Sequence, residues 1–154
     1  MAEPERVIAT NRRARFEYEI EESYEAGMVL TGTEIKSLRT GRASIQEAFA
    51  RVEHDEVWLY HMHIPPYEAG SVFNHDPLRK RKLLLHRSQI RRLFGRAQQK
   101  GYTLVPLRLY FRHGVAKVEL GIARGKKLYD KRAAITRREA ERQVQRALRR
   151  RTVP

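Results

Sequence analysis

Alternation of apolar and charged residues is the feature of this sequence that most constrains its fold. In FEYEIEESY, which begins at Phe16, apolar residues alternate with glutamates, and this period of two is typical of a half-buried β-strand. Similar short apolar segments recur, with turn residues between them at His54-Asp55 and His113-Gly114. About six mostly antiparallel strands are therefore predicted, and a small closed or partly closed β-barrel would leave the fewest strand edges exposed.

Two segments instead have the spacing of helices. In TGTEIKSLRTG, Thr31 and Glu34 are spaced as in a capping box. In SQIRRLFGRAQQKG, apolar residues recur at helical spacing between Ser88, a candidate N-cap, and Gly101, a candidate C-cap. The predicted fold class is thus mainly β with flanking helices, preceded by an irregular arm over residues 1–13.

Positive charge is concentrated at the C-terminal end of the chain. The formal net charge is +14, from 32 Lys and Arg against 18 Asp and Glu. Residues 124–154 hold 12 basic against 3 acidic residues, a net of +9, whereas residues 1–123 hold 20 against 15, a net of +5. This asymmetry predicts a globular body at 1–123 and a basic tail at 124–154. A charge of this size also favours a polyanionic partner.

Several classes of protein are excluded by what the sequence lacks. It has no cysteine, hence no disulfide framework and no thiolate chemistry. No apolar run approaches the roughly 20 residues of a membrane span, and the N-terminus lacks the apolar core of a secretory signal. A cytoplasmic protein without a membrane partner is expected.

None of the candidate catalytic or metal-binding motifs is complete. GIARGKK, residues 121–127, is one residue short of a phosphate-binding loop and has a lysine where a hydroxyl should bind Mg²⁺. His61 and His63 alternate on one predicted strand, but zinc sites usually use three or four protein ligands. His75 and Asp76 are adjacent in FNHDP without a nucleophile beside them, which favours a turn. The sequence therefore predicts no enzyme, no metal and no cofactor.

Basic clusters beside apolar or aromatic residues are the remaining signal. They are NRRAR, RKRK followed by LLLH, HRSQIRR, and the tail. Arginine and lysine neutralise phosphates, while neighbouring apolar or aromatic groups pack against sugars and bases. RNA binding is therefore the favoured function. A metal-dependent nuclease is disfavoured because the carboxylate cluster that it needs is missing.

Five long motifs, in one order, closely resemble the SmpB (SsrA-binding protein) family: NRRARFEYEI, YEAGMVLTGTEIKSLRTGRA, FNHDPLRKRKLLLH, GYTLVPLRLYF and KVELGIARGKKLYDKR. The resemblance runs from about Asn11 to Arg132 and continues into the basic tail. It implies an OB-like antiparallel β-barrel that binds the tRNA-like domain of tmRNA. It further implies delivery of tmRNA to stalled bacterial ribosomes for trans-translation, with the tail in the decoding region of 16S rRNA and the empty mRNA channel.

The resemblance also implies particular RNA-binding residues in the body. They are Glu25, Leu84, His86 and Lys117. Four basic residues are further RNA-binding candidates: Lys36 and Arg39 on the predicted helix, and Arg12 and Arg13 at the basic end of the N-terminal arm. Lys117 can neutralise a phosphate, His86 can stack or donate a hydrogen bond, and Glu25 can accept one from a base or a 2′-hydroxyl. Alternatively, Glu25 and Leu84 shape the surface without touching RNA.

The tail divides into a hinge at 124–132 and a potential helix at 136–150. The resemblance implies ribosome contacts by the hinge residues Lys126, Lys127, Tyr129, Asp130, Lys131 and Arg132. Thr136 and Glu139 have capping-box spacing, which supports the helix. Its apolar stripe is narrow and its arginines repel one another, so we expect this segment to be mostly disordered in the free protein and helical when bound.

A structural ribosomal protein or an RNA chaperone with the same barrel and tail is the alternative function. Such a protein would be present on all ribosomes. A tmRNA-binding protein, expected to act as a monomer, would instead retain one structured RNA selectively.

Overall fold

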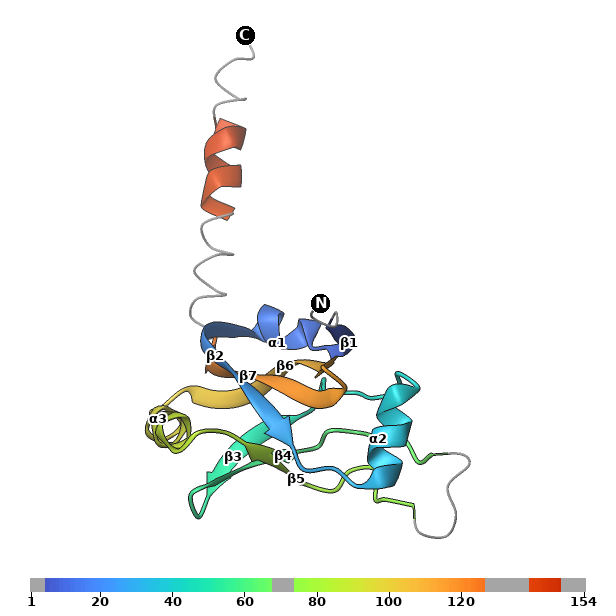
Figure 1. Cartoon of the computed structure of the whole chain (residues 1–154). Helices are drawn as coiled ribbons and strands as arrows, with labels where there is room; N and C mark the ends of the chain where they lie inside the picture. Colours follow the sequence, from blue (N-terminus) through green and yellow to red (C-terminus); the bar gives the residue numbers. More distant parts are fainter. Residues whose placement is uncertain (1–4, 68–73, 127–138, 148–154) are drawn as a thin grey trace.

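The computed structural model describes residues 5–67, 74–126 and 139–147 (Figure 1). Within these ranges, seven strands form one sheet: β1 (Arg6–Thr10), β2 (Tyr18–Met28), β3 (Phe49–Glu53), β4 (Glu56–Tyr60), β5 (Arg81–Leu84), β6 (Tyr102–Arg112) and β7 (Val115–Gly125). Three helices accompany them: α1 (Arg12–Glu17), α2 (Gly32–Arg39) and α3 (Arg87–Ala97). The expected class, mainly β with flanking helices, is confirmed.

The sheet closes on itself. Its strand order is β1-β6-β3-β4-β5-β2-β7, and β7 pairs with β6 as well as with β2, so six strands form a ring with β1 added outside it. Every pairing is antiparallel, and the long β6–β7 and β2–β7 ladders contrast with two short ones. β3 meets β6 only at Ala50 opposite Leu104, and β2 meets β5 at Gly27 opposite Leu84 and Met28 opposite Leu83. These two short ladders, β3–β6 and β2–β5, are the weak seams of the barrel. Along the chain, α3 follows β5 of one seam and precedes β6 of the other.

Two hydrophobic clusters lie on opposite faces of this sheet. The large cluster fills the barrel and includes Leu38, Ile45, Val57, Leu59, Met62, Leu83, Leu93, Leu104, Leu109, Val118, Leu120 and Ile122, which are all nearly or fully buried. The small outer cluster consists of Ala14, Val105, Leu107 and Ala123, with Tyr18 and Ile20 packed against it. The outer cluster attaches α1 to the sheet.

Two β-bulges move side chains from the outer cluster to the barrel core. The β2–β7 register shifts between Ile20 and Glu22, and the β6–β7 register shifts between Pro106 and Arg108. Before its bulge β2 packs Ile20 against the outer cluster, and after it Tyr24 packs against the core. A bulge bends and twists its strand, which helps a short sheet close into a barrel.

A close approach of β6 to β7 at the outer cluster requires a glycine. A Cβ on Gly121 would lie 3.0 Å from Leu107 Cδ1 and 3.3 Å from Ile20 Cγ2. Both atoms belong to side chains packed in the outer cluster. Because Gly121 has no side chain, Leu107, the residue at the β6 bulge, packs directly against the backbone of β7.

A buried ion cluster joins α2 to β5 beneath the barrel core. Glu34 and Arg81 are both fully buried, and Glu34 Oε2 accepts from Arg81 Nε at 2.5 Å. The other carboxylate oxygen accepts from Arg79 Nη2 at 2.5 Å. Arg81 also donates to the carbonyls of Met62 and Pro77. The cluster thus fixes α2, β5 and the end of the 62–77 loop relative to one another.

Several expected turns and caps are confirmed. Thr31 and Glu34 form a capping box on α2. The β3–β4 turn places His54 and Asp55 at φ 49° and 62°, the left-handed backbone of a two-residue hairpin. Asp76 Oδ1 accepts from the Leu78 N–H at 3.0 Å, which makes the expected Asp-Pro turn.

The N-terminal arm was wrongly expected to be irregular. It contains β1, which pairs with β6, and α1, whose N-cap is Asn11. The Asn11 side chain accepts from the Ala14 N–H and donates to the carbonyls of Ile45 and Pro106, so tertiary contacts hold the cap in place. Phe16 consequently lies in α1 with 73% of its surface exposed, and the alternating strand begins two residues later.

The region before α3 contains one strand that was not predicted and one helix cap that was wrongly assigned. The basic run at 79–82 contains the start of β5, which was missed because charged residues obscure its alternation. The N-cap of α3 is His86 and not Ser88, since the His86 N–H donates to Gln89 Oε1 and its carbonyl accepts from the Ile90 N–H.

The body also extends beyond the expected boundary at residue 123. Arg124 pairs with Glu19 and with Tyr102 inside β7, and the Lys126 N–H donates to the Glu17 carbonyl. The expected hinge at 124–132 therefore begins with residues of the sheet.

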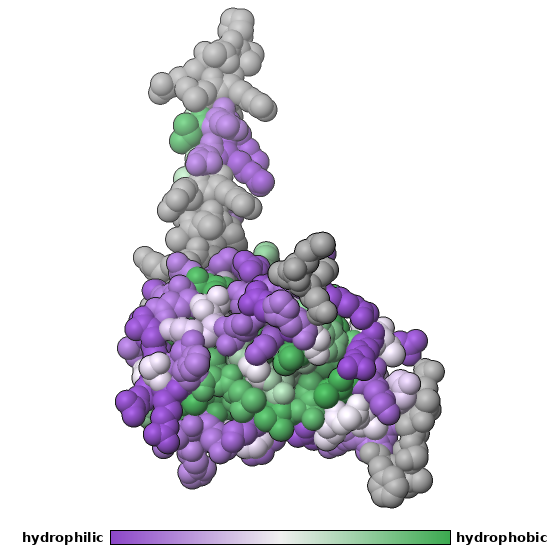
Figure 2. Space-filling view, in the orientation of Figure 1, coloured by the Kyte–Doolittle hydropathy of each residue, from purple (hydrophilic) through white to green (hydrophobic). Residues whose placement is uncertain are grey.

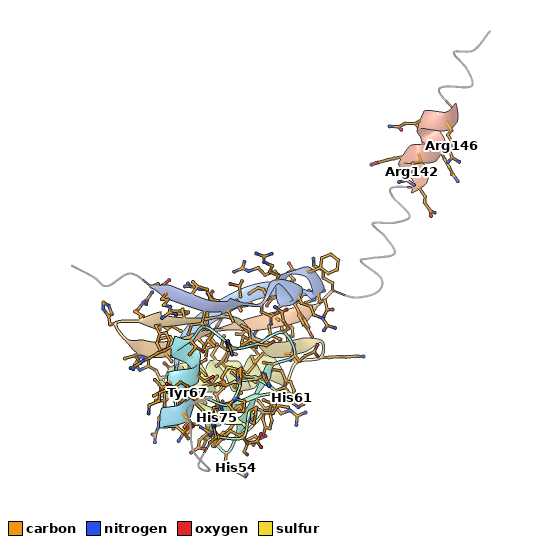
Figure 3. All side chains as sticks on the ribbon, turned by 90° about the vertical axis from the view of Figure 1, so that its right-hand side faces the viewer. His54, His61, Tyr67, His75, Arg142 and Arg146 are labelled. Carbon is orange, nitrogen blue, oxygen red and sulfur yellow. The ribbon has the colours of Figure 1, made fainter. Side chains whose placement is uncertain are left out.

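A helix at residues 139–147 lies inside the potential helix expected at 136–150, and all its residues are exposed. Figure 3 shows Arg142 and Arg146 projecting from it. Ala, Glu, Gln and Arg all have high helix propensity, which favours a helix at these residues. The expectation that this segment is mostly disordered in the free protein and helical when bound stays a prediction.

Candidate RNA interface

Four of the expected RNA-binding residues line one groove in the body. Its volume is about 600 Å³ and it lies where β2, β5 and β7 meet the start of α3. Its lining residues are Ser23, Tyr24, Glu25, Gly27, Leu84, Leu85, His86, Gln89 and Lys117. Residues far apart in the sequence thus come together in one groove.

The strand register places Leu84 and Lys117 on either side of Gly27. Gly27 pairs with Leu84 on β5 and with Lys117 on β7. A Cβ on Gly27 would lie 3.4 Å from Leu84 Cβ and 3.8 Å from Lys117 Nζ. The missing side chain keeps the middle of the groove open between an apolar group and an ammonium group.

The groove combines an apolar floor with one uncommitted cation. Leu84 is 52% exposed, although it is large and apolar. Lys117 forms no ion pair with any residue in the described part of the chain. Figure 2 shows hydrophobic surface on the face where β7 and β2 lie, with hydrophilic residues around it. This arrangement suits a ligand that has both apolar faces and negative charge.

Glu25 is held by the protein at the edge of the groove. Its Oε1 accepts from the Tyr110 hydroxyl at 2.6 Å and lies 2.9 Å from Arg112 Nη1. Burial raises the pKa of Tyr110, and the hydrogen bond to Glu25 raises it further, so the phenol stays a donor. Glu25 therefore shapes the wall of the groove, whatever else it contacts.

His86 lies at the start of α3 beside the groove. Gln89 Oε1 accepts from its backbone N–H at 3.1 Å, and His86 is exposed. The sequence reasoning missed Gln89 and Gly27. Gln89 follows His86 by three residues, which is capping-box spacing and could have identified it. Gly27 is the last residue of the motif YEAG.

The other four body candidates do not line this groove. Lys36 and Arg39 lie on α2, where Lys36 Nζ is 5.9 Å from the centre of the Tyr67 ring. Arg12 and Arg13 lie on α1. Hydrogen bonding to Glu17, at 2.9 Å, raises the pKa of Arg13, which also pairs with Glu47.

Of the expected ribosome contacts, the structure describes only Lys126. Its Nζ lies 6.0 Å from the centre of the Phe16 ring. The remaining candidates lie outside the described residues: Lys127, Tyr129, Asp130, Lys131 and Arg132.

The histidines have structural or surface positions. His61 and His63 are both exposed, and His61 has φ 63°, which interrupts the alternation of its segment. His75 Nε2 is 2.8 Å from the Ile64 carbonyl and Nδ1 is 2.9 Å from Thr33 Oγ1, so it links its loop to α2 (Figure 3). Across residues 5–67, 74–126 and 139–147, no group of three His, Cys, Asp or Glu residues could hold a metal. The same residues contain no helix long and apolar enough to cross a membrane.

The family model and the known proteins that are similar to this chain point to one family. The family model described as SmpB protein matches residues 8–150. The SsrA-binding protein of Desulforudis audaxviator is 58% identical, over 96% of this chain and 96% of that protein. The SsrA-binding protein of Geobacillus thermodenitrificans is 60% identical, over 95% of this chain and 94% of that one.

A solved structure described as "tmRNA-SmpB: a journey to the center of the bacterial ribosome" matches with a TM-score of 0.67 and 58% identity. The match covers 80% of this chain and 87% of the other. A family match over most of the chain, with relatives this similar along their whole length, is decisive: this chain belongs to the SmpB family.

Proposed function

We propose that this chain binds the tRNA-like domain of tmRNA and delivers it to stalled bacterial ribosomes for trans-translation. The observation that carries the proposal is the groove, which gathers Glu25, Leu84, His86 and Lys117 from separate elements. Relatives named for SsrA binding, and a similar structure described with tmRNA and the ribosome, support it. A protein that acts on bacterial ribosomes would be located in the cytoplasm.

The groove provides the interactions that RNA recognition needs. Lys117 offers a cation to a phosphate, and Leu84 offers an apolar surface to a sugar or base. His86 offers a ring that stacks and an N–H that donates. Glu25 is already bonded to Tyr110 and Arg112, so we assign it the positioning of the groove wall. These are binding interactions, and we assign the chain no catalytic step.

The basic tail is proposed to contact the ribosome. Its hinge residues, from Lys126 to Arg132, would engage rRNA in the decoding region, with the planar ring of Tyr129 available for stacking. The helix at 139–147 would then lie in the mRNA channel, where rRNA phosphates neutralise its arginines.

A structural ribosomal or RNA-chaperone role is distinguished by the RNA that the protein retains. Sequencing of copurified RNA should show one structured species, tmRNA, in strong excess over its cellular abundance. Recovery in a constant ratio to all ribosomes, without that enrichment, would favour the alternative.

The groove is tested by the salt dependence of binding to the tRNA-like domain. Replacing Lys117→Ala should weaken binding and lower the slope of log K against log salt by about one unit, because one phosphate contact is lost. Lys100→Ala is the matched control, since Lys100 is exposed and lies outside the groove. An unchanged slope for the Lys117 variant would show that phosphate does not bind in this groove.

A further inference from the structure

A second cleft lies at the other weak seam of the barrel, beside the C-terminal half of α3. Its volume is about 560 Å³, and it is formed by β3, the start of β6 and α3. Its lining residues are Phe49, Ala50, Arg51, Val52, Glu53, Phe94, Ala97, Gln98, Tyr102, Thr103 and Leu104. It shares no residue with the groove that contains Lys117.

The cleft exists because β3 and β6 separate. Their ladder consists of Ala50 opposite Leu104. Glu53 and Glu56 flank the two-residue turn to β4, so alternate residues of β3, Ala50 and Val52, direct their N–H and C=O groups away from β4. Ala50 uses this side to pair with β6, whereas Val52 has no strand partner there among the described residues. One peptide donor and one acceptor therefore face the cleft.

Aromatic side chains from three elements line the cleft. Phe49 comes from β3, Phe94 from α3 and Tyr102 from β6. Phe94 is 47% exposed, which is unusual for a phenylalanine on a helix that already buries Leu93 in the core. Phe49 is stacked on Tyr60, with ring centres 5.4 Å apart. Tyr102 packs against the core, with the Arg96 guanidinium 4.7 Å from its ring centre. The aromatic surface offered to a ligand therefore comes chiefly from Phe94.

The charged residues that line the cleft are one cation, Arg51, and one carboxylate, Glu53. The Arg51 guanidinium lies 5.2 Å from the centre of the Phe49 ring, and Arg51 is exposed. The one acidic lining residue, Glu53, accepts from the Tyr60 hydroxyl and lies 3.7 Å from Lys80 Nζ. These contacts lower the pKa of Glu53, chiefly through the Tyr60 hydrogen bond, so Glu53 stays ionised and its charge is offset by Lys80, while Arg51 is the cation among the lining residues.

We propose that this cleft binds one unstacked base of single-stranded RNA, at a site separate from the groove. Single-stranded bases are recognised by stacking on aromatic side chains and by hydrogen bonds to their edges. The cleft supplies the exposed ring of Phe94 for stacking, the main chain of Val52 for the edge, and Arg51 for the phosphate. Its size is within the range of about 300–1,000 Å³ that holds small ligands.

An extended peptide is the less suitable occupant. Strand addition relies on a row of main-chain hydrogen bonds, and the open part of β3 beyond Ala50 is only Arg51–Glu53. The net charge of +14 also favours a polyanion over a peptide. The inference does not depend on the proposed function, because it concerns different residues.

Amide chemical shifts of the full-length protein test the site directly. The probe is a short unstructured oligoribonucleotide, titrated into the ¹⁵N-labelled chain. Shifts at Val52, Phe94 and Tyr102 are expected. Shifts confined to the groove or the tail would overturn the proposal, and they would leave the role of Lys117 in tmRNA binding untouched.

Substitutions of Phe94 separate base stacking from simple apolar contact. Phe94→Leu keeps an apolar side chain but removes the ring, and should weaken binding of the oligoribonucleotide by at least about fivefold. Phe94→Tyr keeps the ring and should bind like the parent. Both should melt at the parent temperature because Phe94 is half exposed. Equal affinity of the leucine and tyrosine variants would overturn the proposal.

A photo-cross-linking amino acid at Gln98, which lines the cleft, identifies the source of the RNA. Cross-links to tmRNA in the binary complex would assign the base to tmRNA. Cross-links that appear only with ribosomes, and map to rRNA, would assign it to the ribosome. Cross-links to ribosomal protein alone would contradict an RNA occupant.

Discussion

Among single residues, Glu34 has two roles at once: its side chain caps α2 and neutralises two arginines. Burial raises the pKa of Glu34, but hydrogen bonds from Arg79, the Thr31 backbone and Arg81 outweigh burial and hold it below the ordinary value. The capping role was visible in the sequence as a spacing of three residues. The ionic role was not, because Arg79 and Arg81 lie more than forty residues away along the chain.

Replacing Glu34→Gln should lower the free energy of unfolding by about 3–5 kcal/mol, since it leaves the buried Arg81 guanidinium without its counter-charge. Urea denaturation at neutral pH measures the loss. Glu47→Gln is the control, because the Arg13–Glu47 pair is exposed and such pairs contribute at most about 1 kcal/mol. Equal losses in the two variants would contradict a buried ionic role.

The same carboxylate predicts an acid dependence of stability. Because the pKa of Glu34 is lowered by folding, its contribution is complete above the unfolded-state pKa and is lost as pH falls through the lower folded-state value. Unfolding free energies measured from pH 6 downward should therefore fall less steeply in the Glu34→Gln variant than in the parent. Parallel curves would mean that other carboxylates account for the acid sensitivity.

Gly121 allows a residue-scale test of the close approach between β6 and β7. Gly121→Ala should destabilise the protein by about 1–3 kcal/mol, because the new methyl group would lie 3.0 Å from Leu107 Cδ1. Gly125→Ala, on the same strand, meets nothing within 4 Å and should change stability by less than about 0.5 kcal/mol. Thermal melting of the pair gives the comparison, and coincident melting curves would show that Leu107 yields without cost.

At the scale of elements, local patterns predicted most of the fold. The hairpin at His113-Gly114 and the α2 cap depend on neighbouring residues, and both were expected. β5 and α1 were not, because their stability comes from partners distant in sequence: β5 pairs with β2 and β4, and Asn11 is held by Ile45 and Pro106. Residue patterns alone do not contain this information.

The candidate site was likewise only partly predictable from the sequence. Its four central residues were identified through long family motifs, and strand register then brings them together at Gly27. The aromatic cleft was not anticipated, because Phe49, Phe94 and Tyr102 belong to three segments that each have an ordinary apolar pattern. A separation between two strands has no signature in a single sequence.

The helix at 139–147 should be only marginally stable as an element. Every residue in it is exposed, and isolated helices shorter than about 12–15 residues are marginal in water. Amide exchange in the free protein should therefore show little protection there, while the long β6–β7 ladder is strongly protected. Protection of 139–147 similar to that of β7 would mean that the helix packs against another surface.

For the whole molecule, half of the net charge lies beyond the sheet. Residues 127–154 hold 10 basic and 3 acidic residues, a net of +7 out of +14. The charge available for long-range attraction of RNA is thus largely separate from the groove that would select it.

Removal of residues 127–154 should therefore preserve selective binding of the tRNA-like domain but abolish tagging of stalled chains. The truncation keeps all of β7 and the Lys126 hydrogen bond to Glu17, unlike a cut at residue 123. Competition with unrelated RNA measures selectivity, and in vitro trans-translation measures tagging. Normal tagging by the truncated protein would refute the division of roles.

Closure of the ring has a consequence for the order of folding. The β6–β7 hairpin is local and can form early, whereas β2 must find β7 across most of the chain, and such distant pairings form slowly. The groove needs β2, β5 and β7 together, so it is assembled at that slow step. On the proposed function, a newly synthesised chain would become competent to bind RNA in the groove abruptly, when its barrel closes, and the bound RNA would then stabilise the closed barrel.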